Sequence, residues 1–318
     1  MSDFALAVDI GGTKVAAALV ATDGTVAERR VRPTAGSPDP EEVWLPVAEL
    51  VADLRAVAGT GRVVGVGVGS AGPIHLPEGS ISPVNIPAWR RFPLLDRLAE
   101  LVPGVPVRLA GDGSCAAVGE HWRGAGQGVD DLLAIVVSTG VGGGLIQAGR
   151  LVAGPTGNAG HIGHMVVDLD GVPCPCGGRG CVEAMSSGPS MVAWALSAGW
   201  QAPVPAPTGV DLADAARTGD PHANEAFRRS GRSLAAGIVS TAAICDLSRV
   251  VIGGGVAAAH DLLFPPLREA IAEHGRLAFL RELTVTTASL GNAAGLVGAA
   301  ALVLAPEAYA GRGVASLT

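Results

Sequence analysis

The sequence predicts an α/β protein whose two halves begin alike. "FALAVDI", "GGT" and "KVAAALV" read as a buried strand, a glycine turn and a returning strand, and "LLAIVVS", "TGVGG" and "GLIQAG" repeat this order later. The length of 318 residues exceeds one ordinary hydrophobic core and suggests two domains or one bilobed unit. The repeat favours a duplicated fold.

The first half continues with alternating helices and strands. A helix is expected over about residues 40–58, because Asp39 and Pro40 are typical of a helix start and Glu41 and Glu42 fall in its first turn. The segment "RVVGVGVGS" reads as a strand. A second helix near 93–101 and a strand near 105–110 then lead to "GDGSCAAVGEHW".

The second half has the same alternation after a cysteine-rich segment. The expected elements are helices near 187–197, 221–245 and 260–274, strands "RVVIGG" and "LTVTTA", and a last helix rich in glycine and alanine. No long linker or low-complexity segment interrupts this order. We therefore expect the domains to share a cleft.

Composition excludes several classes of partner. The formal net charge is −7 and Lys14 is the only lysine, so a surface that follows a nucleic-acid backbone is not expected. No apolar run reaches about 18 residues without a charge or a breaker, which argues against a membrane span. Asp3 stands where a secretion signal carries positive charge. These features predict a cytoplasmic protein.

The five cysteines divide into two groups. Cys115 and Cys245 lie in helix-like stretches of small residues and read as buried apolar side chains. The other three form an H-x9-C-x-C-x4-C arrangement with an upstream histidine, which is the Cys3His donor set of structural zinc sites: His164, Cys174, Cys176 and Cys181. Reduced or redox-active thiols are the alternative interpretation.

Three glycine-rich turns follow apolar strands. Backbone N–H groups in such turns bind phosphate oxygens, although a single glycine turn often only reverses the chain. None of the three matches the P-loop or a clean dinucleotide-binding pattern. The turns are Gly11-Gly12-Thr13-Lys14, Ser138 to Gly144, and Gly253-Gly254-Gly255.

These motifs resemble those of the ROK sugar kinases (repressors, open reading frames and kinases), over nearly the whole chain. "VDIGGTK" is similar to the first phosphate motif of the family, "STGVGGG" to the second and "IGGG" to the adenosine segment. "GHMVV" followed by "CPCGGRGCVE" is similar to its zinc and sugar signature.

The resemblance implies a bilobed actin-like ATPase fold, the hexokinase type, with duplicated βββαβα-type lobes and a cleft between them. It implies a small N-terminal lobe over residues 1–110 that is completed by a C-terminal helix over about 300–318. Residues 111–299 then form a large lobe with the zinc-binding loop. ATP, Mg²⁺ and structural Zn²⁺ are the implied cofactors.

The resemblance also implies which residues form the sites. Asp9 is expected to help hold Mg²⁺ through water. The expected nucleotide contacts are Asp9, Gly11, Gly12, Thr13, Lys14, Thr139, Gly140, Gly142, Gly254 and Gly255. The expected sugar contacts are Gly72, Asn85, Gly111, Asp112, His161, His164 and Glu183. Asn85 and Trp89 lie in "PVNIPAW", for which a surface turn with a packed tryptophan is the alternative interpretation.

Asp112 is the candidate catalytic base. The transfer of a γ-phosphoryl group needs a group that accepts the proton of the attacking sugar hydroxyl. In "LAGDGSCAAVGE" the aspartate stands at a junction between strand and helix, where a helix N-cap is the alternative role. The resemblance implies transfer to the 6-hydroxyl, and zinc is expected to pin a loop so that Glu183 and His164 face the sugar.

Three departures from the family pattern concern the sugar. Gly111 and Ser114 replace two asparagines that the family usually has, and His161 replaces a glutamate. Changed polar contacts on one side of the sugar favour a modified glucose, and an amino-hexose such as kanosamine, the 3-amino analogue of glucose, is our preferred candidate. An ordinary glucokinase is the alternative, with the departures as neutral drift.

Other functions within the family are less consistent with the sequence. A sugar-responsive transcription factor would carry a DNA-binding segment before the first phosphate motif, which here begins at Asp9. A non-catalytic sugar-sensing protein is disfavoured by the retained Asp112, and polyphosphate as donor is disfavoured by the scarcity of lysine. The fold usually assembles as a homodimer or homotetramer.

Overall fold

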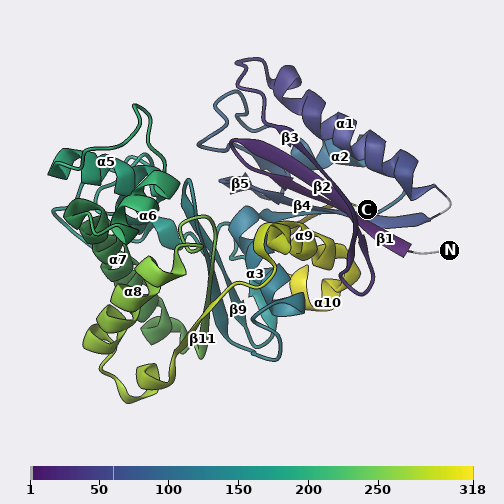
Figure 1. Cartoon of the computed structure of the whole chain (residues 1–318). Coiled ribbons are helices and arrows are strands. Elements are labelled where there is room, and N and C mark those ends of the chain that lie inside the picture. The colour runs from purple at the N-terminus through teal and green to yellow at the C-terminus, as the bar shows by residue number, and fades with distance from the viewer. Residues whose placement is uncertain (1–2, 60, 318) are drawn as a thin grey trace. The chain divides into compact units, whose positions relative to one another are not determined.

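The computed structural model describes residues 3–59 and 61–317, and these divide into two compact units (Figure 1). Among the described residues, unit 1 contains 3–59, 61–130, 144–160 and 290–317, and unit 2 contains 131–143 and 161–289. The lobe boundaries expected from the sequence stay a prediction. No helix in the described part of the chain is long and apolar enough to cross a membrane.

Unit 1 is built on a six-stranded sheet with the strand order β13-β7-β4-β1-β2-β3. Strands β1, β4 and β7 are parallel, whereas β2, β3 and β13 pair antiparallel with their neighbours. The strands are β1 Asp3–Ile10, β2 Lys14–Ala21, β3 Val26–Pro33, β4 Arg62–Ser70, β7 Val107–Gly111 and β13 Ala315–Leu317. A small β5–β6 pair, Ile74–His75 with Ser80–Ile81, lies outside this sheet.

The two faces of this sheet carry different side chains, and β4 shows why. Val66 and Val68 join the core under α1, Pro40–Ala58, and α2, Leu94–Leu101. The alternate residues are glycines on the opposite face, where a Cβ at Gly67 would lie 1.8 Å from the carbonyl oxygen of Ala299. The alternating "VGVGVG" pattern therefore places α1 and α9 on opposite faces of the sheet (Figure 1).

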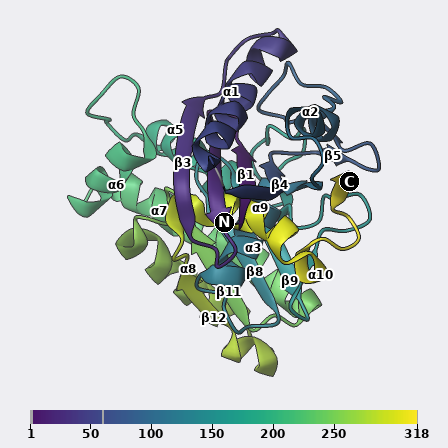
Figure 2. The same cartoon turned by 90° about the vertical axis from the view of Figure 1, so that its right-hand side faces the viewer.

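Helices α3, Asp112–Arg123, and α9, Ala294–Leu304, pack with their backbones in close contact (Figure 2). A Cβ at Gly298 would lie 1.7 Å from the carbonyl oxygen of Cys115, and one at Gly119 would lie 2.1 Å from that of Ala294. The prediction of a C-terminal helix over about 300–318 is wrong in its bounds, because α9 begins at Ala294 and ends at Leu304. The short α10, Pro306–Tyr309, and strand β13 follow it, because Pro306 interrupts the helical pattern.

The second sheet has the strand order β10-β9-β8-β11-β12, which repeats the order β3-β2-β1-β4-β7 of the first. Strands β8, β11 and β12 are parallel, as are β1, β4 and β7. The strands are β8 Leu132–Val137, β9 Val141–Gln147, β10 Arg150–Val152, β11 Arg249–Gly253 and β12 Thr284–Thr287. The repeat confirms the duplicated α/β fold that the sequence predicts.

Helices α7 and α8 of unit 2 lie side by side in both views (Figures 1 and 2). Asp220 caps α7 by accepting hydrogen bonds of 2.9 Å from the N–H groups of His222 and Ala223, so the helix begins where the sequence places it. The helices of unit 2 are α4 Val182–Ser186, α5 Gly188–Ala198, α6 Gly209–Arg217, α7 Pro221–Cys245 and α8 His260–His274. Short 3₁₀ turns are η1 Ile162–His164 and η2 Ala278–Glu282 here, and η3 Gly291–Ala293 in unit 1.

Candidate active site and metal centre

Two carboxylates of unit 1 lie at the carboxyl edge of its three parallel strands. Asp9 of β1 is paired with Gly69 of β4, and Gly69 is paired with Ala110 of β7, so the three residues form one row across the sheet. Asp112 follows two residues beyond Ala110. Open α/β sheets bind ligands at this edge, outside the carboxyl ends of the strands.

Asp9 is in an unfavourable environment for a carboxylate. Burial, and next the nearby Asp112 carboxylate, raise the pKa of Asp9 to about 6, although Lys14 and Arg29 act to lower it. Helix α9 also approaches closely, because a Cβ at Gly295 would lie 2.9 Å from Oδ2 of Asp9. The ionised form of Asp9 therefore lowers the free energy of unfolding, and a cation bound to Asp9 would offset this loss.

We expect Asp9→Asn to stabilise the protein at neutral pH in the absence of divalent cations. The folded-state pKa of Asp9 lies above its unfolded value, so the charge penalty is complete above about pH 6, falls as the pH decreases, and is absent below about 4. A shift of about two pKa units corresponds to at most ~3 kcal/mol in the free energy of unfolding. Urea unfolding of both proteins from pH 4 to 8 measures this difference. A constant difference across that range would contradict the assignment.

Asp112 is the first residue of α3, and its side chain is exposed. The N-cap position is occupied by Gly111, so the alternative role of Asp112 as an N-cap is wrong. Its Oδ1 accepts a 2.7 Å hydrogen bond from the N–H of Gly113. The carboxylate thus sits at the N-terminal, positive end of a helix.

The first glycine turn joins β1 to β2 beside the "PVNIPAW" loop. The N–H of Gly11 donates to the carbonyl of Lys14 at 3.0 Å, while Thr13 and Lys14 are exposed. A Cβ at Gly12 would lie 2.6 Å from Cγ of Asn85, so only glycine lets the turn approach the exposed Asn85 so closely.

The other residues expected on the sugar side differ in their burial and in the space around them. Trp89 is fully buried and stacks on Phe92 with ring centroids 4.3 Å apart, so it is a core residue. Gly72 follows β4 and is partly exposed. At Gly111 a Cβ would meet only Ser114, with Oγ at 3.6 Å, which is an ordinary contact. The space around Gly111 thus admits a side chain.

The two glycine turns of unit 2 lie against each other at the carboxyl ends of β8 and β11. Gly254 has a φ of 98°, and a Cβ there would lie 2.3 Å from the carbonyl oxygen of Val137. The N–H of Val256 donates to this same carbonyl at 3.0 Å. Thr139, Gly254 and Gly255 are exposed, and no atom lies within 4 Å of a Cβ at Gly142. These backbones are open to a ligand.

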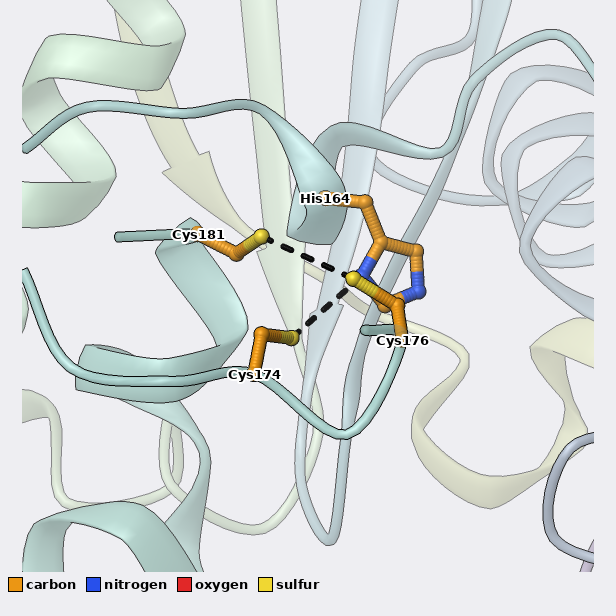
Figure 3. A group of neighbouring side chains, drawn as sticks. All are labelled: His164, Cys174, Cys176 and Cys181. Atoms are coloured by element: carbon orange, nitrogen blue, oxygen red, sulfur yellow. Dashed lines mark hydrogen bonds between the residues drawn. The ribbon is translucent and has the colours of Figure 1, made fainter. Parts of the chain in front are cut away.

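The four predicted metal ligands converge in unit 2 (Figure 3). Their donor atoms all lie within 4.8 Å of one another. The sulfurs of Cys176 and Cys181 are 3.8 Å apart, and Nδ1 of His164 is 3.9 Å from the sulfur of Cys174. A disulfide needs a separation of about 2.0 Å, whereas a tetrahedral zinc with bonds of about 2.3 Å places two sulfurs about 3.8 Å apart.

The chemistry of the cluster also fits a metal. Burial and the two neighbouring thiols raise the pKa of Cys181 to about 12, and burial raises that of Cys174. Three thiols in such close contact cannot all ionise unless a cation compensates them. The donor set and its spacing are thus compatible with structural zinc and argue against a redox disulfide.

Glu183 and the two histidines flank this cluster. Oε2 of Glu183 accepts a 2.8 Å hydrogen bond from the N–H of Val141, the residue that opens β9. The ring of His161, which is exposed, stacks on that of His164 with centroids 6.0 Å apart. His161 therefore lies directly beside a candidate metal ligand.

Two contacts of the candidate sites were missed from the sequence. Gly295 at Asp9 belongs to "AGLVGAA", where two glycines three residues apart indicate one helix face with a close neighbour, but not which neighbour. The bond between Glu183 and Val141 joins residues that are far apart in the sequence, and no local motif marks it.

Comparison with known proteins agrees with this geometry. Residues 5–305 match the ROK family. The chain is 34% identical to the glucokinase of Thermotoga maritima over 94% of this chain and 96% of that protein. It is 36% identical to an N-acetylmannosamine kinase of Escherichia coli over 93% of this chain and 97% of that protein.

A solved structure shows the same fold. The ROK family glucokinase from Streptomyces griseus, in complex with glucose and AMPPNP, superposes with a TM-score of 0.81 at 34% identity, covering 94% of this chain and 99% of that one. The match to the family extends across both units. The chain therefore belongs to the ROK family, with the actin-like hexokinase fold that its motifs predict.

Proposed function

We propose that this protein is an ATP-dependent sugar kinase that phosphorylates the 6-hydroxyl of glucose or of a modified glucose. The observation that carries the proposal is the pair of carboxylates, Asp9 and Asp112, at the carboxyl edge of unit 1, next to the glycine turn after β1. Similarity to a glucokinase and to an N-acetylmannosamine kinase supports the reaction class.

Asp112 acts as the base in this proposal. Its exposed carboxylate accepts the proton of the sugar hydroxyl while the hydroxyl oxygen bonds to the γ-phosphorus, and the bond from that phosphorus to the bridging oxygen of ADP breaks. Mg²⁺, when bound, neutralises charge on the phosphates. Asp9 is the residue proposed to hold its hydration shell, and its raised pKa is then lowered by the cation.

The glycine turns are proposed to bind ATP. Their backbone N–H groups suit phosphate oxygens, and Lys14 adds the positive charge of the first turn. The proposed contacts are Gly11, Gly12, Thr13 and Lys14 in unit 1, and Thr139, Gly140, Gly142, Gly254 and Gly255 in unit 2. The exposed backbones at Gly254 and Gly255 are assigned to the adenosine part.

The sugar is proposed to contact Gly72, Asn85, Gly111, Asp112, His161, His164 and Glu183. Zinc fits the cluster of His164 with the three cysteines and would fix the loop that carries His164 and Glu183. In the part of the chain that the structure describes, the side chain of Glu183 bonds only to Val141 through Oε2, which leaves Oε1 for a sugar hydroxyl. Cytoplasmic location and a homodimer or homotetramer remain predictions.

An amino-hexose such as kanosamine is the substrate we propose. The space at Gly111 admits a substituent, and His161, when neutral, is able to accept a hydrogen bond from an ammonium group, as the family glutamate in its place also could. Discrimination by matched polar groups reaches about 10⁴–10⁵-fold. Asp112, His164 and Glu183 of the family pattern are retained.

We expect an amino-hexose to give the highest kcat/KM in a panel that also contains glucose, mannose, N-acetylated hexosamines and carbocyclic analogues, measured by coupling ADP formation. The double variant Gly111→Asn with His161→Glu should move the ranking towards glucose, because the asparagine side chain fills the space proposed for the substituent. If glucose is the best substrate and the variant leaves the ranking unchanged, the specificity proposal is wrong.

A further inference from the structure

The glycine turn after β8 rests directly on the carboxylate of Glu183. Oε2 of Glu183 accepts the 2.8 Å hydrogen bond from the N–H of Val141, and a Cβ at Gly140 would lie 2.8 Å from this same oxygen. An alanine at residue 140 would therefore displace this carboxylate. The conformation of the turn therefore depends on its contact with Glu183.

Two further contacts attach the same turn to the chain around the metal cluster. The N–H of Gly188, which follows α4, donates to the carbonyl of Ser138 at 2.8 Å. At the end of the turn near β9, a Cβ at Gly163 would lie 1.9 Å from the carbonyl oxygen of Val141, so the backbone of η1 packs directly against the start of β9. Both ends of the turn are thus held.

The segments that make these contacts also carry the metal ligands. Gly163 precedes His164, and Cys181 is the N-cap residue of α4, on which Glu183 is the second residue. The N–H of Val182 donates to the carbonyl of Met165 at 3.0 Å and joins the two segments directly. A metal bound by His164 and Cys181 would fix both of them relative to each other (Figure 3).

We propose that Glu183 is a positioning residue for the Ser138–Gly143 turn, through which metal binding at the Cys3His cluster and nucleotide binding at the turn reinforce each other. The role in nucleotide binding rests on the proposed function, whereas the link between metal and turn does not. The role is additional to a sugar contact, because Oε2 faces the turn and Oε1 has no partner among the described residues. Coupling between two sites is reciprocal and typically about 5–150-fold in affinity.

Hydrogen exchange of the amides in residues 138–143, read by mass spectrometry on the full-length protein, tests the link. Removing zinc with a chelator should speed exchange in this turn at least several-fold, because the N–H of Val141 loses a fixed acceptor. Glu183→Ala, which removes the acceptor, and Gly140→Ala should do the same with zinc still bound. Gly36→Ala is the control, since a Cβ there also meets no atom within 4 Å and the residue belongs to none of the proposed sites.

Titration of a non-hydrolysable ATP analogue into the zinc-loaded proteins gives the second readout. We expect the affinity to fall about tenfold in Glu183→Ala, within the usual range of coupling. If chelation and both variants change exchange only within residues 164–183, and the turn keeps its wild-type exchange and affinity, the proposal is overturned. If the wild type binds no ATP analogue, the proposed function fails, while exchange in the turn still decides whether metal and turn are linked.

Discussion

Asp112→Asn is expected to lower kcat for phosphoryl transfer by about 10²–10⁴-fold, the usual contribution of a positioned base. The amide keeps the size of the carboxylate and can still accept the hydrogen bond from the N–H of Gly113, but it cannot take the proton of the sugar hydroxyl. Sugar and ATP affinities should stay within a few-fold. Steady-state kinetics and calorimetric titration of both ligands separate these two effects.

Asp96→Asn is a matched control for this variant, because Asp96 is also an exposed aspartate in the first turn of a helix of unit 1. Its kinetics should equal those of the wild type. Near wild-type kcat in Asp112→Asn would remove Asp112 from the mechanism.

Zinc removal is the second change with a large expected effect. Purified protein should contain one zinc per chain, and chelation should abolish activity by loosening the loop that carries His164 and Glu183. Structural zinc sites are closed and four-coordinate, so the metal offers no open position to the substrate. Metal analysis and activity after dialysis against a chelator measure both parts of this prediction.

Cys181→Ser should lose the metal and the activity together, because Cys181 is a buried member of the cluster and the N-cap residue of α4. Cys245→Ser is its control, since Cys245 lies at the end of α7 and outside the cluster. Protein that is fully active without zinc, or a sugar bound directly to the metal, would show that the metal has another role.

The sequence predicted what depends on residues close together in the chain. The start of α1 follows from the cap at Asp39, and the metal cluster follows from cysteines only a few residues apart. An aspartate before a helix caps its first turn, and cysteine and histidine are the ligands that zinc prefers. Both signals lie within a short stretch of sequence.

What the sequence could not predict depends on contacts between distant segments. β13 is short and pairs with β7 from the far end of the chain, and its three residues have no strand pattern of their own. The raised pKa of Asp9 likewise comes from burial and from Asp112, which only the order of the parallel strands brings near. Likewise, Trp89 was open to two interpretations until its stacking on Phe92 showed it to be a core residue.

The most direct test of the kinase assignment is phosphorus NMR of the wild-type protein with Mg-ATP and the panel of hexoses. We expect the γ-phosphorus signal of ATP to be replaced by that of a sugar 6-phosphate in equal amount to ADP, and Asp112→Asn to suppress both products. The result that would contradict the account is a protein that binds a hexose and an ATP analogue with its metal site filled, yet forms no sugar phosphate from any member of the panel.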